Sequence, residues 1–266
     1  SISLQVTVGC SHNLCTFCGV YKDVDFRIKE DDVVNQDIVF AARHCTRQTR
    51  VFLADGDVLS LPHHKLLNIM ERVRVKLPHV RKISLYGNGR SIRNKSISDL
   101  AALKKHGLNR IYLGLESGDN QVLEKIRKGE TAESLVEAGR KVMDAGIFLS
   151  TTVLLGIGGR ERSEKHGLAT ARLLNQISPN QIAALTLMVL KNTPLARQVD
   201  KKSFHPLGAP EFLKELLCIV ENLTVDKVQF MANHSSNYLP ITGRLSRDRE
   251  RIIRDIEQAI SGSIDL

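Results

Sequence analysis

Residues 2–18 read ISLQVTVGCSHNLCTFC, a β-branched run that passes directly into a loop with three cysteines. The β-branched and apolar residues predict a strand over residues 2–8. The same order, a strand followed by a loop rich in Gly, Asn or acidic residues, recurs along the chain. The further predicted strands span residues 50–55, 82–87, 110–117, 148–156 and 182–190.

Amphipathic stretches separate these strands and predict helices over residues 31–45, 63–77, 96–107, 134–146 and 163–177. Parallel strands need right-handed helical crossovers. The alternation therefore predicts an α/β fold, a partial (β/α)6 barrel of the TIM type, over residues 1–195. Reactive groups in such folds lie at the C-terminal ends of the strands. The loops GCSHNLCTFC, DGD, YGNG, ESGD, GIGG and KNTP should form that rim.

The pattern changes toward the C-terminus. Residues 209–223 and 247–260 read as amphipathic helices, and residues 228–233 read as one more strand. No Gly-rich or Pro-rich linker separates this part from the predicted barrel. We therefore expect residues 196–266 to form a C-terminal extension packed on the barrel, and not an independent domain.

The composition is that of a globular protein, with 42% hydrophobic and 25% charged residues among 266. The chain has no apolar run of eighteen residues and no signal-peptide pattern, which predicts a cytoplasmic protein without membrane insertion. The net charge of +9 favours anionic partners. Because the basic residues are not clustered, a dedicated nucleic-acid surface is possible but not favoured.

Three cysteines fall within nine positions, at Cys10, Cys15 and Cys18. Structural zinc is almost always held by four ligands, and His12 could be the fourth. An iron–sulfur cluster with three cysteine ligands would instead leave one iron open to a small molecule. The place of the loop at the reactive end of the barrel favours iron–sulfur, while zinc and unligated thiols remain alternatives.

The other two cysteines, Cys45 and Cys218, lie alone in apolar helical patterns. Their surroundings predict small buried hydrophobic side chains. Neither belongs to a second cysteine group, so an auxiliary cluster is not expected.

The loop GCSHNLCTFC resembles the cluster loop of radical S-adenosylmethionine (radical SAM) enzymes. The usual family spacing is C-x3-C-x2-C, whereas this chain has C-x4-C-x2-C. The resemblance implies that Cys10, Cys15 and Cys18 bind a [4Fe–4S] cluster whose open iron chelates SAM. It also implies that Phe17 lies against the adenine ring.

Two other strand tips are similar to family segments. Asp55-Gly56-Asp57 stands where the family has a Gly-Gly-Glu segment that contacts the SAM amino group, with Asp55 departing from glycine. Residues 114–131, GLESGDNQVLEKIRKGET, resemble the corresponding segment of methylthiotransferase-like members. That match implies SAM contacts from Glu116, Ser117 and Lys128.

The segment LLGIGG over residues 154–159 resembles the glycine-containing segment whose backbone approaches adenine. This implies a role for Gly156 and Gly158. The substrate side is less defined. Residues 233–238, NHSSNY, predict either a substrate-binding loop or, equally, an ordinary polar turn. The candidates for substrate-facing residues are Tyr86, Asn88, Thr193, Asn233, His234 and Asn237.

The resemblance implies a function: reductive cleavage of SAM to a 5′-deoxyadenosyl radical that abstracts hydrogen from an unidentified, anionic metabolite. It further implies a one-electron donor such as flavodoxin or ferredoxin. An RNA- or protein-modifying radical SAM enzyme is the alternative that the basic charge and the ESGD segment support. A non-catalytic zinc or iron–sulfur binding module is the alternative from another class.

Overall fold

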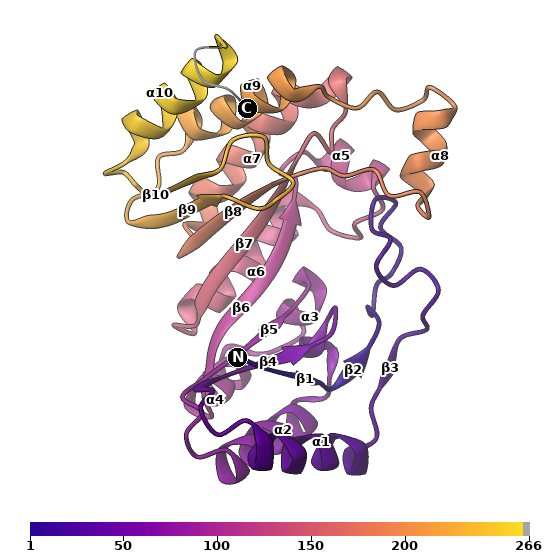
Figure 1. Ribbon diagram of the computed structural model, residues 1–266, viewed down its shortest axis with the longest axis vertical. Helices are drawn as coiled ribbons and strands as arrows, with labels where there is room; N and C mark the ends of the chain where they lie inside the picture. The colour runs from indigo at the N-terminus through magenta and orange to yellow at the C-terminus, as the bar shows by residue number, and fades with distance from the viewer. Residues whose placement is uncertain (263–266) are drawn as a thin grey trace. The chain divides into compact units, whose positions relative to one another are not determined.

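The computed structural model describes residues 1–262 as an α/β chain that gathers into two compact units (Figure 1). The first unit consists of Ser1–Asn13, Asp23–Leu113 and Glu137–Leu149, and the second of the remaining segments. Strand β6 (Leu108–Glu116), helix α6 (Ala132–Asp144) and strand β7 (Phe148–Leu155) each contribute residues to both units.

The first unit is built on parallel strands in the order β1-β4-β5-β6. Alternate residues such as Val51, Leu53 and Leu85 are fully buried, as the pleat of a covered sheet requires. Helices α1 and α2 lie side by side in this unit (Figure 1). The elements are β1 (Ile2–Gln5), β4 (Arg50–Ala54), β5 (Lys82–Tyr86), α1 (Asp31–His44), α2 (His63–Lys76) and α4 (Ile97–Lys105).

The connections of the first unit contain short elements that the sequence pattern does not predict. The predicted strand over residues 2–8 is divided, because β2 (Thr7–Val8) leaves β1 and pairs antiparallel with β3 (Arg27–Ile28). A 3₁₀ turn at Val58–Ser60 follows β4, and helix α3 (Gly89–Arg93) follows β5. These short elements place the loops after β1, β4 and β5.

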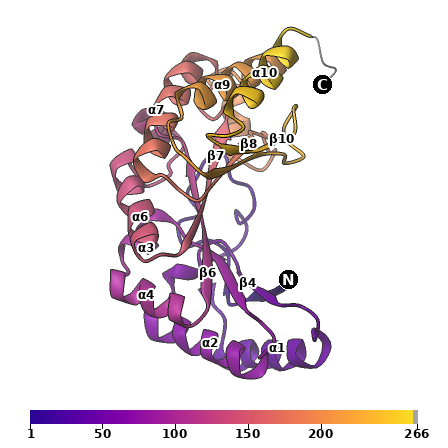
Figure 2. The same ribbon diagram turned by 90° about the vertical axis from the view of Figure 1, so that its left-hand side faces the viewer.

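In the second unit, β7, β8 (Gln181–Thr186) and β9 (Val228–Ala232) run parallel, and β10 (Ile241–Leu245) pairs antiparallel with β9. Helices α7, α9 and α10 pack in a row along these strands (Figure 2). The helices of this unit are α5 (Asn120–Lys125), α7 (Ser163–Ile177), α8 (Pro194–Asp200), α9 (Ala209–Asn222) and α10 (Arg249–Ile260).

The six strands and the helices predicted between them are confirmed, within a few residues at each end. The predicted strand over 182–190 is too long, because β8 ends at Thr186, whose amide donates to the Asn237 side chain and not to a neighbouring strand. Helices α5 and α8 and strand β10 were not predicted. The boundary at residue 195 stays a prediction.

The two isolated cysteines, Cys45 and Cys218, are half-buried, so the expectation of buried side chains is wrong in degree. Cys45 ends α1, where its carbonyl is 2.9 Å from Nε2 of His79. Burial raises the pKa of the Cys218 thiol, and the neighbouring glutamates act in the same direction. Along residues 1–262, none of the helices combines the length and apolar character that crossing a membrane requires.

Candidate functional site

Asp57, in the DGD turn after β4, is fully buried and is the centre of a polar cluster in the first unit. Its carboxylate accepts hydrogen bonds from the hydroxyls of Ser11 and Ser91 and from Nδ2 of Asn88, the last at 2.8 Å. The Asn88 amide also donates to it, at 3.1 Å. Burial raises the pKa of Asp57, although these hydrogen bonds oppose the rise. The cluster joins the cysteine loop to the turns after β4 and β5.

The same turn is also bonded to the start of the cysteine loop, through the Asp55 side chain and the Gly56 backbone. Asp55 accepts from the Gly9 amide at 3.1 Å and from Gln5 Nε2 at 2.9 Å. The Gly56 amide donates to the Gly9 carbonyl at 3.2 Å. Gly9 has a φ of +82°, a conformation that glycine adopts without steric cost. The DGD turn therefore fixes the backbone directly before Cys10.

Tyr86, at the end of β5, is 46% exposed and belongs to an aromatic cluster on one face of the first-unit strands. Its ring centroid is 5.1 Å from that of Phe52 and 5.6 Å from that of Tyr112. Arg110 donates to the Tyr112 hydroxyl at 3.2 Å, and its guanidinium lies 4.1 Å from the Phe148 ring centroid. Only Tyr86 of this cluster was predicted to face a substrate.

Thr16, between the second and third cysteines of the loop, is held by its backbone on both sides in the second unit. Its amide donates to the Ile126 carbonyl at 2.9 Å, and its carbonyl accepts from the Leu195 amide at 3.0 Å. Just past Cys18, Asn192 Nδ2 donates to the Gly19 carbonyl at 2.9 Å. A Cβ atom on Gly19 would lie 2.3 Å from Asn192 Oδ1, so a larger residue there would displace the Asn192 side chain.

A cavity of about 310 Å³ lies in the second unit beside Thr16, whose buried hydroxyl has no hydrogen-bond partner. This volume is within the range of small-molecule sites. The lining includes Val122, Lys125, Ile157, Glu161, Gln198 and Phe204.

None of the five cysteines forms a disulfide, and Cys10, Cys15 and Cys18 are half-buried. Cys10 belongs to the first unit, and Cys15 and Cys18 belong to the second. Within residues 1–262, no three His, Cys, Asp or Glu side chains are gathered closely enough to hold a metal ion. The three-thiol ligand set, and with it Phe17 as an adenine contact, stays a prediction.

Glu116 and Lys128, both predicted to contact SAM, form an ion pair at 2.8 Å in the second unit. Their side chains are only 12% and 11% exposed. Glu116 has a φ of +62°, which is rare for a residue other than glycine and is found mainly where structure imposes it. Gly114 makes room for the pair, since a Cβ atom there would lie 2.3 Å from Glu116 Oε1.

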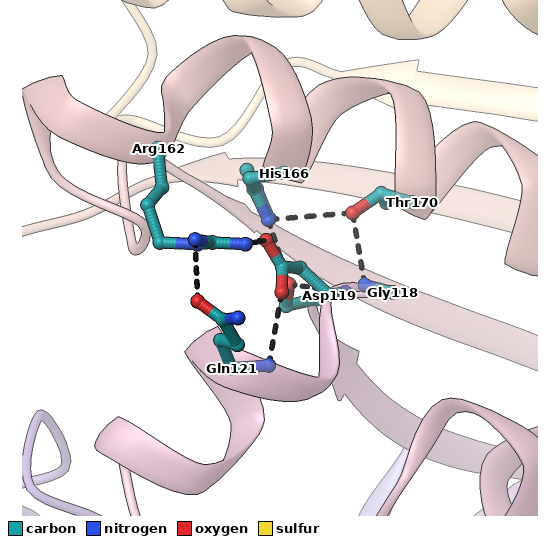
Figure 3. A network of polar contacts seen from close by, with 7 residues as sticks. Gly118, Asp119, Gln121, Arg162, His166 and Thr170 are labelled. Atoms are coloured by element: carbon teal, nitrogen blue, oxygen red, sulfur yellow. Dashed lines mark hydrogen bonds and ion pairs between the residues drawn. The ribbon is translucent and has the colours of Figure 1, made fainter.

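Ser117, also predicted to contact SAM, is fully buried and bonded within the protein. Its Oγ lies 2.8 Å from Nδ1 of His166 and accepts the Asp119 amide at 3.0 Å. The next residue, Gly118, donates its amide to Thr170 Oγ1 at 3.0 Å (Figure 3). The structure thus gives Ser117 a role in anchoring the ESGD turn on α7, and its contact with SAM stays a prediction.

Asp119 closes the same turn and is neutralised by Arg162, which stands just before α7 (Figure 3). The guanidinium donates to Asp119 Oδ2 from Nε at 2.9 Å and from Nη2 at 2.6 Å. Arg162 also donates to Gln121 Oε1, and Asp119 Oδ1 caps α5 by accepting the Gln121 amide at 2.9 Å. These bonds bind the turn after β6 to the start of α7.

Gly156, the first glycine of the GIGG turn, has its amide 2.6 Å from Oε1 of Glu215 on α9. The other carboxyl oxygen of Glu215 accepts from the Ser163 hydroxyl. Burial raises the pKa of Glu215 to about 7, against the lowering effect of these two bonds. Burial lowers the pKa of His166 to about 4, although Asp119 acts in the opposite direction.

The loop between β9 and β10 carries three predicted substrate-facing residues, of which Asn237 is bonded to the C-terminal part of β8. Asn237 donates to the Ala184 carbonyl and accepts the Thr186 amide, both at 2.8 Å. The Ser236 amide donates to Nδ1 of His234 at 3.1 Å, so the proton of a neutral His234 ring is on Nε2. His234 and Asn233 are exposed, whereas Asn237 is half-buried by its bonds to β8.

Thr193 is fully buried, and its hydroxyl accepts the Ala196 amide at 3.2 Å and donates to the Leu190 carbonyl at 2.6 Å. It is the N-cap of α8, and its contact with a substrate stays a prediction. Asn88 likewise caps α3, by accepting the Ser91 amide at 2.8 Å. The Thr-Pro pair at 193–194 is a helix-start signal that could have predicted α8.

His166, Glu215, Ser11 and Ser91 were not predicted, although each bonds to a predicted site residue. A signal exists for two of them. His166 and Glu215 interrupt the apolar faces of α7 and α9, and a buried ionisable residue usually needs a specific partner. The two serines carry no comparable signal.

The fold defines the class of this protein first. The described chain matches a Kitasatospora setae structure titled as the radical S-adenosylmethionine methyltransferase TsrM with cobalamin and a [4Fe–4S] cluster bound. The TM-score is 0.64 at 15% identity, over 97% of this chain and 61% of that one. The fold is therefore the α/β partial barrel of such enzymes, with mostly parallel strands, as predicted.

Residues 4–174 match the family model described as the radical SAM superfamily. The match spans more than half of the chain, so the protein belongs to the radical SAM superfamily. Membership implies a [4Fe–4S] cluster and SAM as cofactors. The residues fit this implication, because the loop offers three thiols outside any disulfide and its backbone is held at Gly9 and Thr16.

Two curated proteins are similar to this chain. The 4′-phospho-dehydrooxetanocin synthase of Priestia megaterium is 28% identical over 170 residues, which are 56% of this chain and 22% of that protein. An "uncharacterized protein" of Methanocaldococcus jannaschii is 20% identical over 233 residues, 84% of this chain and 71% of that protein. The chain thus spans under a quarter of the first relative's length.

Proposed function

We propose that this protein binds a [4Fe–4S] cluster through Cys10, Cys15 and Cys18 and uses it with SAM on a small anionic metabolite. The observation that carries the proposal is the family match over residues 4–174, which includes all three cysteines. When bound, the two cofactors supply a 5′-deoxyadenosyl radical that abstracts a substrate hydrogen. The three thiols leave one iron without a protein ligand, and a fourth cysteine would block it.

The chain's own residues hold and orient SAM in this proposal. The Glu116–Lys128 pair offers a carboxylate and an ammonium for the charged groups of SAM, and the GIGG turn offers backbone at Gly156 and Gly158. Asp57 has all its hydrogen bonds inside the fold. Its contribution to SAM binding therefore acts through the cysteine loop and the turn after β5, while Asp55 borders the loop directly.

Three observations support an anionic metabolite as the substrate class. The net charge is +9, and the aromatic cluster around Tyr86 includes the guanidinium of Arg110. The relative from Priestia megaterium is named for a 4′-phospho compound. His234, Asn233 and Asn237, together with Tyr86, are the residues that we propose for substrate recognition. A protein of the flavodoxin or ferredoxin type would supply the electron.

Anaerobic reconstitution with iron and sulfide tests the proposal directly. The wild-type protein should gain a brown chromophore and four irons, and then form 5′-deoxyadenosine when SAM and dithionite are added. The variant Cys15→Ala should lose the cluster, whereas Cys45→Ala, outside the loop, should keep it. A wild-type protein that takes up only tetrahedral zinc would contradict the proposal and favour a non-catalytic zinc module.

The basic charge also supports a second candidate, an RNA-modifying member of the same superfamily. That function requires binding to RNA that weakens steeply as salt rises, because phosphate contacts release counterions. A binding titration with a bulk transfer RNA mixture at low and high salt distinguishes the two. Absence of binding at low salt would exclude this candidate and leave the metabolite.

A further inference from the structure

Helices α7 and α9 connect the two turns that we propose to hold SAM, the ESGD turn after β6 and the GIGG turn after β7. The connection runs through buried polar side chains of the second unit, from Ser117 to His166, then Glu215, then the Gly156 amide. Ser117, His166 and the Glu215 side chain are all completely buried. Figure 3 shows how His166 and Thr170 of α7 face the ESGD turn.

We assign the proton of the neutral His166 ring to Nε2, because this nitrogen faces the Glu215 carboxyl oxygen. The Ser117 hydroxyl can then donate to Nδ1, from which it is 2.8 Å away. Nε2 lies 3.4 Å from Glu215 Oε1, too far for a well-formed hydrogen bond. A buried donor without a partner is costly, so a small shift that closes this gap would be favourable.

Glu215 acts on the other turn. Its Oε1 accepts the Gly156 amide at 2.6 Å, and the neighbouring α9 residue Phe212 stands where a Gly156 side chain would be. A Cβ atom on Gly156 would lie 2.3 Å from the Phe212 ring, and Gly156 has a φ of +80°. Two residues of α9 therefore fix the position and the conformation of Gly156.

We propose that Glu215 is a positioning residue for SAM, which holds the GIGG turn at a fixed place relative to the ESGD turn. The inference rests on the proposed function, because SAM contacts at these turns are part of it. Glu215 itself lies beneath the turn and touches only Gly156, Ser163 and His166 among the groups described above. It acts through Gly156, not by contact with SAM.

The proton state of Glu215 should modulate this role. The ionised carboxylate makes stronger bonds to the Gly156 amide and to His166 Nε2 than a neutral acid does. The titratable groups that face it are His166 on α7 and Cys218 one turn further along α9. Because burial places the pKa of Glu215 at about 7, the carboxyl changes its charge near neutral pH.

The test compares SAM binding to the reconstituted protein and three variants, by calorimetry and by the electron paramagnetic resonance signal of the reduced cluster. Glu215→Leu removes the acceptor, and we expect about tenfold weaker SAM binding, the size of an ordinary coupling between contacting residues. Glu215→Gln keeps the bond to Gly156 and should bind about threefold more weakly at pH 8. Glu221→Gln, an exposed position on the same helix, is the control and should match the wild type.

The pH dependence separates positioning from a general loss of structure. The ratio of wild-type to Glu215→Gln affinity should rise about threefold from pH 6 to pH 8, because only the wild-type carboxylate ionises. Titrations shared by both proteins, including those of SAM, cancel in the ratio. If Glu215→Leu does not fold, the affinity ratio of wild type to Glu215→Gln is sufficient to test the inference.

A constant ratio, with Glu215→Gln within twofold of the wild type at both pH values, would overturn the inference. That failure is distinct from a failure of the proposed function, in which the wild-type protein itself would bind no cluster or no SAM.

Discussion

Asp57 and Glu215 are both carboxyl groups buried beneath turns that follow parallel strands, yet their surroundings differ. Asp57, in the first unit, accepts four hydrogen bonds, from Ser11, Ser91 and twice from Asn88. Glu215, in the second unit, accepts two, and the nearest further donor, His166 Nε2, is 3.4 Å away. The first site is therefore complete as it stands, and the second has room to respond to a proton or a ligand.

The difference also concerns where the partners come from. The Asp57 partners lie in the loops after β1 and β5, the two strands that flank β4 in the first unit. Glu215 reaches Gly156 from a helix 59 residues further along the chain. A carboxyl with several donors is a rigid local anchor, whereas one with a distant backbone partner links a helix to a strand tip.

The largest expected effect comes from Asp57→Ala. It leaves the buried Ser91 hydroxyl, the Ser11 hydroxyl and two N–H groups of Asn88 without their acceptor, and we expect a loss of about 3–5 kcal/mol in the free energy of unfolding. Urea denaturation of the unreconstituted protein measures it. A loss below about 1 kcal/mol would show that water satisfies these donors and that the cluster is not an anchor. Asp37→Ala, at a half-exposed ion pair with Lys29, is the matched control and should cost under about 1 kcal/mol.

The comparison of Asp57 with Glu215 also shows how much of each site can be predicted from the sequence. The strand alternation predicts the fold, and the loops after the strands predict Asp55, Asp57, Glu116 and Gly156, because glycine and acidic residues at strand tips are local signals. The partners of Asp57 are serines and an asparagine, which occur in most turns and carry no distinguishing pattern. Only the folded chain shows which of them is bonded to the carboxylate.

Glu215 and Ser117 show a second reason why a residue or its bonding partner is missed in the sequence. Glu215 lies within the apolar stretch LKELLCIV, where helical periodicity indicates a buried face but not what it is buried against. Ser117 belongs to a segment similar to a family motif, and the resemblance predicts a ligand contact. The pairing of Ser117 with His166 depends on the packing of α7 against the strand tip, which no local pattern contains.

The next prediction concerns pH and tests the pair His166 and Glu215. The folded pKa of Glu215 is about 7, above its ordinary 4.5, so its contribution to stability rises as the pH falls from 7 to 4.5. The folded pKa of His166 is about 4, below its ordinary 6.5, so its contribution falls as the pH drops from 6.5 to 4. In the wild-type protein the two trends offset one another over most of this range.

Single variants should separate the two trends. Glu215→Gln removes the rise, so its stability relative to the wild type should decrease by up to about 3 kcal/mol between pH 7 and pH 4.5. His166→Gln should show the opposite sign, becoming relatively more stable toward acid. Urea titrations at several pH values give both differences, with groups common to all three proteins cancelling. Parallel curves for the three proteins would mean that neither group titrates in the folded state as described.

The smallest effects should come from substitutions of Gly114 and Gly118, which flank Glu116. They test whether packing on α7 or the Glu116–Lys128 pair holds the ESGD turn. A Cβ atom on Gly118 would lie 2.2 Å from the Ala169 carbonyl oxygen and 2.8 Å from the Thr170 Cα, both backbone atoms of α7. A Cβ atom on Gly114 would instead meet the ends of the Glu116 and Lys128 side chains. Backbone cannot yield without moving the helix, whereas a side chain can rotate away.

Gly118→Ala should therefore cost about 2–3 kcal/mol in the free energy of unfolding, and Gly114→Ala about 1 kcal/mol or less. The two variants should differ less in SAM affinity than in stability, because Gly114→Ala displaces Glu116 and Lys128, which we propose to contact SAM. Urea denaturation and calorimetric SAM titration of both variants measure the two quantities. Equal stability losses would show that α7 moves as easily as a side chain. The contact between the ESGD turn and α7 would then be loose, and Glu215 could not hold the GIGG turn at a fixed place relative to the ESGD turn.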